Sequence, residues 1–371
     1  MRIAVPTEIK NNEYRVAITP AGAHDLIAAG HEVVVQSGAG EGSSIPDAAY
    51  SDVGVTIAPD ADEVWGAADL VLKVKEPIES EYRHFRSDLL LFTYLHLAAD
   101  KQLTTALLDS GMTALAYETV ELPDRSLPLL APMSEVAGRL SAIVGANTLL
   151  KPAGGPGLLV PGVPGTHPAN ITVIGGGVAG TNAAHVALGL GARVTVLDTN
   201  LSRLRDIDAL YGGRIETVAS NAVEIERSVI GADLVIGSVL VPGARAPKLV
   251  TNDLVARMRK GSVLVDIAID QGGCFEDSHP TTHAEPTFPV HGSVFYCVAN
   301  MPGAVPHTST YALTNATLPY IRSVATHGWK AAAMRDAALA KGLNVHGGAI
   351  ANQGVAEAHG LHLTPVETLL T

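Results

Sequence analysis

Four basic side chains suited to binding a small anionic substrate follow short apolar runs in the first 100 residues. Lys73 and Lys75 close one run with alternating spacing that predicts a shared face, His96 closes the next, and Arg15 follows the first. The carboxyl ends of parallel strands line the crevice where open α/β sheets bind ligands. Lysine or arginine there can hold a carboxylate, and histidine, with an unperturbed pKa of about 6.5, can transfer protons. Each also has a structural alternative, as a solvated rim charge or a hydrogen-bonded histidine.

A carboxylate closes another apolar run much later in the chain. Residues 263–270 read VLVDIAID and precede Gly272 and Gly273. The pattern predicts that Asp270 ends a strand beside a flexible turn, where it could face a bound ligand. Asp266 lies inside the same predicted strand, and we expect it to be structural.

A glycine-rich turn at residues 171–180, with the sequence ITVIGGGVAG, is the strongest local motif. Gly175 permits a tight turn, Gly177 lets backbone N–H groups approach a pyrophosphate, and Gly180 lets the helix pack on the strand. Val178 and Ala179 open that helix, whose N-terminus carries partial positive charge. The motif predicts a dinucleotide site, and the alternative is a tight structural turn.

The apolar run after the glycine turn ends in Asp198, 18 residues beyond Gly180. A carboxylate there accepts hydrogen bonds from the ribose hydroxyls and repels a 2′-phosphate. The spacing therefore predicts NAD rather than NADP, although Arg203 is close enough to weaken that preference.

Short apolar runs alternate with helical stretches through the whole chain, which predicts βαβ units and mostly parallel sheets. A helix over residues 20–29 is expected to begin with Thr19 as N-cap and Pro20 in the first turn and to stop at Gly30. Strands are predicted at residues 3–5, 32–36, 55–58, 69–74, 89–94 and 113–116, and in a second block at 171–175, 193–198, 216–219, 234–239, 263–269 and 294–298.

The second block suits a dinucleotide-binding sheet of strand order 3-2-1-4-5-6. Long helices are predicted at residues 132–151, capped by Ser134, and at 308–326, with a surface loop at 154–168. The predicted fold is α/β with two Rossmann-like domains joined by long helices around a cleft. Residues 1–130 and 305–371 would form a discontinuous substrate domain, and 131–304 the NAD-binding domain.

Composition narrows the class of protein further. The 371 residues are 47% hydrophobic and carry a net charge of −12, which argues against a disordered chain and against a nucleic-acid partner. Two cysteines and no visible secretory signal predict a cytoplasmic protein.

Residues 152–192 lack charge, but prolines and the glycine turn argue against a membrane helix. Motifs for zinc, hydrolase and Walker-type sites are missing from the sequence.

Several longer motifs resemble the bacterial L-alanine dehydrogenases, within the wider family that includes the nucleotide-binding part of proton-translocating transhydrogenase. The resemblance rests on residues 6–20 (PTEIKNNEYRVAITP), 72–77 (LKVKEP), 117–119 (YET), 130–138 (LAPMSEVAG), 171–180, 266–276 (DIAIDQGGCFE), 296–302 (YCVANMP) and 308–315 (TSTYALTN). His279 departs from the pattern, because arginine is expected there.

The resemblance implies reversible, NAD-dependent oxidative deamination of L-alanine to pyruvate and ammonium by a homohexamer. It implies that Arg15 and Lys75 hold the substrate carboxylate, that His96 is the general acid and base, and that Asp270 assists. The NAD site would be lined by Ser134, Gly175, Gly177, Val178, Ala179, Gly180, Asp198, Arg203, Ser220, Val239, Leu240, Ile267, Ala268, Ile269, Asp270, Val298, Ala299, Asn300 and Met301.

Two further implications leave alternatives open. Glu118 and His327 match positions that hold a magnesium ion in such enzymes, and the alternative is a surface or interface pair. The competing function is a non-catalytic NAD(H)-binding component, like a transhydrogenase subunit, or a dehydrogenase for another small amino acid.

Overall fold

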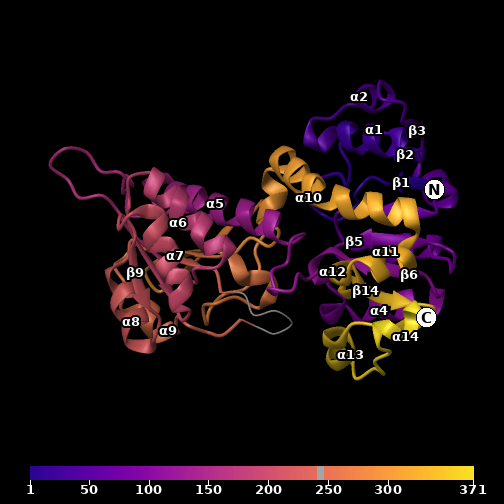
Figure 1. Ribbon diagram of the computed structural model, residues 1–371. Coiled ribbons are helices and arrows are strands. Elements are labelled where there is room, and N and C mark those ends of the chain that lie inside the picture. Colours follow the sequence, from indigo (N-terminus) through magenta and orange to yellow (C-terminus); the bar gives the residue numbers. More distant parts are fainter. Residues whose placement is uncertain (240–245) are drawn as a thin grey trace. The chain divides into compact units, whose positions relative to one another are not determined.

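The computed structural model describes residues 1–239 and 246–371, and it divides into two compact units (Figure 1). Unit 1 comprises Met1–Met133 and Val305–Thr371, and unit 2 comprises Ser134–Ala304. Each unit has its own mostly parallel sheet with helices packed on it, so the predicted α/β class is confirmed.

Unit 1 holds an eight-stranded sheet of order β15-β14-β6-β5-β4-β1-β2-β3. The strands are β1 (Arg2–Val5), β2 (Glu32–Gln36), β3 (Thr56–Ala58), β4 (Leu70–Leu72), β5 (Leu90–Thr93), β6 (Thr113–Ala116), β14 (Leu343–His346) and β15 (Ala349–Ile350). All six predicted strands are present and pair in parallel, whereas β14 returns from the C-terminal segment to pair antiparallel with β6. In Figure 1 this yellow segment lies beside the purple strands of the same unit.

Helices and short 3-10 turns connect these strands. They are α1 (Pro20–Ala28), α2 (Asp47–Ser51), α3 (Ala61–Ala67), α4 (Lys101–Ser110), α10 (Pro306–His327), α11 (Trp329–Arg335), α12 (Ala337–Lys341), α13 (Gln353–His359), α14 (Val366–Leu370), η1 (Glu41–Ser43), η2 (Glu79–His84), η3 (Leu97–Ala99) and η4 (Tyr117–Thr119). The predicted start of α1 is confirmed, because the Thr19 hydroxyl accepts the Gly22 amide hydrogen at 3.3 Å.

Unit 2 holds a seven-stranded sheet of order β12-β13-β11-β10-β7-β8-β9. The strands are β7 (Asn170–Ile174), β8 (Arg193–Asp198), β9 (Glu216–Ala219), β10 (Leu234–Gly237), β11 (Val263–Asp266), β12 (Thr287–Val290) and β13 (Ser293–Tyr296). Six of them have the predicted order 3-2-1-4-5-6. The seventh, β12, was not predicted. It contains Pro289, which an edge strand tolerates because its outer side needs no donor.

The helical elements of this part of the chain are α5 (Ala131–Thr148), α6 (Val178–Gly189), α7 (Leu201–Tyr211), α8 (Ala222–Gly231), α9 (Asn252–Ala256), η5 (Lys151–Ala153), η6 (Ile267–Gln271) and η7 (Met301–Ala304). The prediction that Ser134 caps α5 is wrong, because the helix begins at Ala131. Pro132 is tolerated in this first turn, where its missing N–H would have had no helical partner. Residues 154–168 form the predicted loop (Figure 1).

The two sheets share one feature that locates their sites. In each, the strand order reverses direction beside the first strand, between β1 and β4 in unit 1 and between β7 and β10 in unit 2. Open α/β sheets bind ligands at this switch point, beyond the carboxyl ends of the strands. Among the described helices, none is long and apolar enough to cross a membrane.

Candidate functional sites of the two units

Lys73 is a buried structural charge, which corrects the expectation that it shares a face with Lys75. Strand β4 ends at Leu72, so the alternation that placed both lysines together stops before either. The Lys73 ammonium is 1% exposed and pairs with Glu8 at 3.0 Å and Glu81 at 2.9 Å. Its positive charge therefore stabilises these two buried carboxylates.

Lys75 is held at the same sheet edge by its backbone. The second oxygen of Glu8 accepts the amide hydrogens of Val74 at 2.5 Å and Lys75 at 3.4 Å. Burial raises the pKa of Glu8, and the charge of Lys73 opposes that rise. The Lys75 side chain is half-buried, and its ammonium makes no ion pair with any residue that the structure describes. Lys75 is thus a cation available to an anionic ligand.

Arg15 already has a carboxylate partner. Its guanidinium is 2% exposed and binds Glu13 through two contacts, Nε to Oε1 at 2.6 Å and Nη2 to Oε2 at 2.5 Å. Nη1 lies 3.0 Å from the Met133 sulfur. The bidentate contact expected for a substrate carboxylate is therefore made by Glu13, a residue that the sequence reasoning missed although it lies two positions away.

The prediction that His96 ends its strand is wrong. His96 lies three residues beyond the end of β5. Its backbone φ is +49°, and its imidazole Nδ1 lies 3.2 Å from Oε2 of Glu76. The other Glu76 oxygen contacts the Lys10 ammonium. The ring is 39% exposed, so a substrate can reach it. The loops after β1, β4 and β5 thus bring Lys75, His96 and their carboxylate partners to one edge of the sheet.

Glu118 and His327, which the resemblance links to magnesium, both make other contacts in the structure. Glu118 accepts the amide hydrogens of Leu95 and His96, and the His327 Nε2 lies 3.0 Å from the Arg335 guanidinium. Within residues 1–239 and 246–371, no group of three or more His, Cys, Asp and Glu side chains gathers around a metal position.

The glycine turn of unit 2 has the geometry of an anion site. Gly175 has a φ of +102°, and a Cβ at Gly180 would lie 1.7 Å from the Gly175 carbonyl oxygen. A Cβ at Gly177 would meet no atom within 4 Å, so the space beside that residue is open. The 12-residue helix α6 begins immediately afterwards, at Val178. The open backbone and the helix N-terminus therefore fit a dinucleotide pyrophosphate.

Asp198 connects the end of β8 to this turn. One carboxylate oxygen accepts the Gly176 amide hydrogen at 2.7 Å and the other accepts that of Asn200 at 2.7 Å, while Arg203 lies 3.6 Å away. On the opposite side, the Ser238 hydroxyl donates to the Ile174 and Gly175 carbonyls. Ser238 was not predicted, because a single serine after an apolar run carries no signal in the sequence.

We expect Asp198→Ala to weaken NAD binding by about tenfold or more, since a hydrogen bond to a charged group contributes roughly 1.5–3 kcal/mol. Discrimination against NADP should fall as well, because the 2′-phosphate no longer meets a negative charge. Titrations with both reduced cofactors, followed by fluorescence, measure this. Asp206→Ala, which removes an exposed carboxylate from the same helical region, is the control. An unchanged preference for NAD would remove Asp198 from this role.

Asp270 lies in η6 and not at the end of a strand, which corrects the prediction for this segment. Strand β11 ends at Asp266, whose buried carboxylate accepts the amide hydrogen of Cys274 at 2.8 Å and the hydroxyl hydrogen of Ser278 at 2.6 Å. Burial raises the Asp266 pKa against these hydrogen bonds. Asp266 therefore secures the loop that follows, as expected for a structural residue, and Asp270 is exposed on η6.

The remaining predicted cofactor residues lie near strand ends and helix starts of unit 2. Leu240 falls outside the described residues. The others occupy the first turn of α5 (Ser134), the start of α6 (Val178 and Ala179), the residues after β9 and β10 (Ser220 and Val239), η6 (Ile267, Ala268 and Ile269) and the segment after β13 (Val298, Ala299, Asn300 and Met301).

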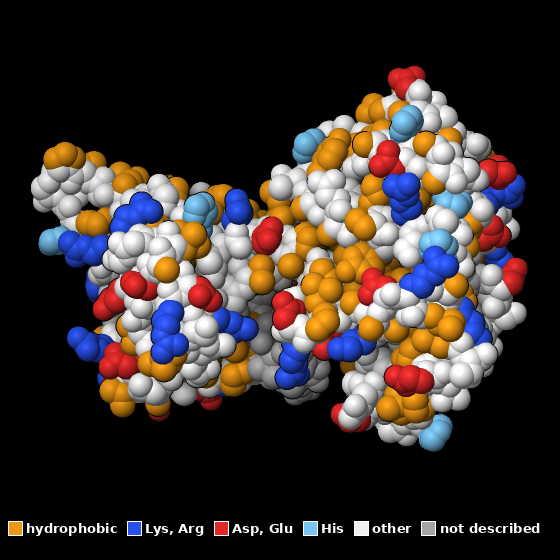
Figure 2. Space-filling model, viewed as in Figure 1, with side chains coloured by type: hydrophobic (Ala, Val, Ile, Leu, Met, Phe, Trp, Pro, Cys, Tyr) orange, Lys and Arg blue, Asp and Glu red, His pale blue; other side chains and the backbone are white. Residues whose placement is uncertain are grey.

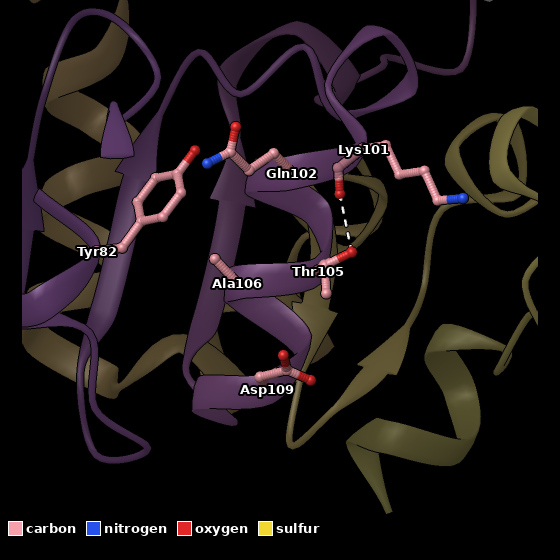
Figure 3. A pocket seen from close by; sticks show the side chains of 6 residues that line it. All are labelled: Tyr82, Lys101, Gln102, Thr105, Ala106 and Asp109. Atoms are coloured by element: carbon pink, nitrogen blue, oxygen red, sulfur yellow. Dashed lines mark hydrogen bonds between the residues drawn. The ribbon is translucent and has the colours of Figure 1, made fainter. Parts of the chain in front are cut away.

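A surface hollow in unit 1 lies apart from these predicted residues. Figure 3 shows the side chains that line it, from Tyr82 and from α4. The Thr105 hydroxyl donates within the helix to the Lys101 carbonyl at 2.9 Å, and the Lys101 ammonium points away from Tyr82. None of the lining residues is one that the sequence assigned to substrate or cofactor.

Acidic and basic side chains are mixed on the face of the molecule shown in Figure 2. Lys and Arg side chains do not form a continuous stripe on that face.

Comparison with known proteins gives matches along both units. The profiles of the N-terminal and C-terminal domains described as alanine dehydrogenase/PNT match residues 4–137 and 141–353. An alanine dehydrogenase of Mycolicibacterium smegmatis is 61% identical over 370 residues, 100% of both chains. A solved L-alanine dehydrogenase structure is 51% identical with a TM-score of 0.94, covering 97% of this chain and 99% of its own. A transhydrogenase structure from Sinorhizobium meliloti is 25% identical with a TM-score of 0.82, covering 95% and 99%.

Proposed function

The chain belongs to the alanine dehydrogenase/PNT family, and we propose from this premise that it catalyses reversible, NAD-dependent oxidative deamination of L-alanine. The reaction is L-alanine + NAD⁺ + water ⇌ pyruvate + ammonium + NADH + H⁺. The observation that carries the proposal is 61% identity to an alanine dehydrogenase over the full length of both chains. NAD, when bound, supplies the acceptor for a hydride from the substrate Cα.

In unit 1, Lys75 binds the substrate carboxylate, since its ammonium is unpaired among the described residues. Arg15 supports that binding from within its ion pair with Glu13. His96 removes a proton from the substrate ammonium group before hydride transfer and passes it to solvent, as the H⁺ released in the overall reaction, which regenerates the neutral imidazole. It then deprotonates the water that attacks the iminium carbon and returns a proton to the departing ammonia. The fixed loops hold these groups in position and lower the entropic cost of reaching the transition state.

In unit 2, the open backbone at Gly177 and the start of α6 would hold the cofactor pyrophosphate, and Asp198 would accept hydrogen bonds from the ribose hydroxyls. The resemblance gives Asp270 an assisting role, in which its carboxylate stabilises positive charge on the iminium. The other predicted cofactor residues that the structure describes would contact the nicotinamide and adenosine portions of the cofactor.

The direct test follows NADH by absorbance at 340 nm with purified protein, NAD⁺ and L-alanine under alkaline conditions. We expect a rise that depends on all three components. Absence of a rise would favour the second candidate, a non-catalytic NAD(H)-binding component, which the 25% identical transhydrogenase structure supports. A panel with L-serine and 2-aminobutyrate, and with glyoxylate in the reverse direction, tests whether the carboxylate site accepts other small substrates.

We also propose a homohexamer, which the resemblance implies, and a cytoplasmic location, which the low cysteine content favours. Light scattering on the purified protein tests the first, with an expected mass six times that of the 38.4 kDa chain. A mass of one or two chains would contradict it. The two cysteines, Cys274 and Cys297, are free and buried, which agrees with a reducing compartment.

A further inference from the structure

We propose that Glu76 is a positioning residue that fixes the imidazole of His96, so that Nε2 is the nitrogen that exchanges a proton with the substrate. The inference rests on the proposed function, in which His96 is the general acid and base. It adds a residue to that function and states which ring nitrogen performs the chemistry.

Glu76 lies between His96 and Lys10. One of its carboxylate oxygens is 3.2 Å from His96 Nδ1, and the other contacts the Lys10 ammonium. The side chain is only 10% exposed. Burial alone would raise the pKa of Glu76, but the hydrogen bond with His96, the charge of Lys75 and the hydrogen bond from Lys10 hold it well below its usual range. The carboxylate is therefore ionised at neutral pH.

An ionised carboxylate has no hydrogen to donate, so the imidazole nitrogen that faces it must carry one. Nδ1 is then protonated in both the neutral and the charged forms of His96. Nε2 is left as the nitrogen that is bare in the neutral ring and protonated in the charged ring. Within the described part of the chain, Nε2 has no hydrogen-bond partner, whereas Nδ1 has Glu76.

Two other contacts prevent the ring from adopting a different position. The backbone of His96 is in the left-handed region, which is costly for a residue with a side chain unless its surroundings hold it. Glu118 does so, accepting the amide hydrogens of His96 at 2.7 Å and Leu95 at 3.2 Å. The buried ring of Tyr94 stacks against the imidazole with centroids 5.9 Å apart. The backbone, one ring face and Nδ1 are all held, and Nε2 stays open.

A simpler interpretation is that Glu76 only pairs with Lys10 and stabilises the loop after β4. The two interpretations differ in what a neutral isostere does. In Glu76→Gln, the carboxamide can donate to Nδ1 and favour the tautomer in which Nε2 carries the hydrogen. A structural role predicts lower stability with an unchanged chemical step, whereas a positioning role predicts a slower chemical step.

The experiment combines steady-state kinetics with ¹⁵N NMR of histidine-labelled protein, in which the resonances of His96 are assigned by their loss in His96→Ala. We expect the wild-type protein to show the Nδ1–H tautomer. Glu76→Gln should lower kcat by on the order of 10²-fold or more, with KM for L-alanine changed by less than about threefold, and should increase the Nε2–H tautomer. Glu79→Gln makes the same chemical change at an exposed position three residues away and should match the wild type.

An Nε2–H tautomer in the wild-type protein would overturn the inference, and this result does not depend on the folding of Glu76→Gln. So would a Glu76→Gln protein whose kcat matches that of Glu79→Gln. The tautomer is measured without turnover, so this result does not depend on whether the protein has the proposed activity. If wild-type protein does not oxidise L-alanine, the function fails while the orientation of His96 is still tested.

Discussion

Replacing His96 with alanine lowers kcat for L-alanine oxidation by on the order of 10³-fold, within the range that a general acid and base contributes. The loss follows because one imidazole serves the ammonium deprotonation, the activation of water and the protonation of ammonia. Lys75 and Arg15 remain to hold the substrate carboxylate, so the binding of pyruvate should change much less. NADH binding should be retained, since the glycine turn and Asp198 belong to unit 2.

Stopped-flow and steady-state absorbance at 340 nm measure the rate, and NADH fluorescence measures binding. His24→Ala is the matched control, because His24 is an exposed histidine of α1 whose side chain is 62% accessible. Turnover near the wild-type value in His96→Ala would refute the assignment of the acid and base. Loss of NADH binding in the same variant would show that the substitution had disturbed more than the chemistry.

Gly180→Ala should destabilise unit 2 by roughly 3–5 kcal/mol and abolish NADH binding, because the new methyl group meets backbone that cannot move aside. Its Cβ would lie 1.7 Å from the Gly175 carbonyl oxygen and 2.6 Å from the Ser238 hydroxyl. Separating those atoms requires α6 to move away from β7, which opens the glycine turn. The free energy of unfolding from a urea titration gives the stability change.

Gly177→Ala, in the same turn, tests the effect on ligand binding apart from the effect on folding. A Cβ at Gly177 has open space, so we expect the free energy of unfolding to stay within about 1 kcal/mol of the wild type. NADH affinity should still fall, because the methyl group occupies the place where the backbone meets the pyrophosphate. Normal NADH binding by Gly177→Ala, or normal stability of Gly180→Ala, would contradict this account of the turn.

The strands were predictable because their signal is local. Apolar runs bounded by turn residues located all six parallel strands of each sheet, and the alternation of six strands with helical stretches predicted the strand order of unit 2. The C-terminal strands β14 and β15 were missed, and β14 pairs with β6, which lies more than 200 residues earlier in the chain. Local pattern contains no information about such a pairing.

The cationic residues of the candidate site could be predicted from the sequence, but the carboxylates that contact them could not. Lys75 and His96 follow apolar runs, but the strands end before them, at Leu72 and Thr93, and this changes which side chains are buried. Lys73 therefore pairs with Glu8 and Glu81 inside the unit. The carboxylates that hold Lys75 and His96 come from separate loops, and only the folded sheet edge brings them together.

The most direct measurement of the central claim runs the reaction in reverse, with pyruvate, NADH and ¹⁵N-ammonium, and analyses the product by chiral mass spectrometry. We predict one ¹⁵N-labelled L-alanine for each NADH consumed, and no NADH consumption when ammonium is omitted. Consumption of NADH without incorporation of ¹⁵N, with lactate as the product, or no consumption at all, would contradict the proposed reductive amination.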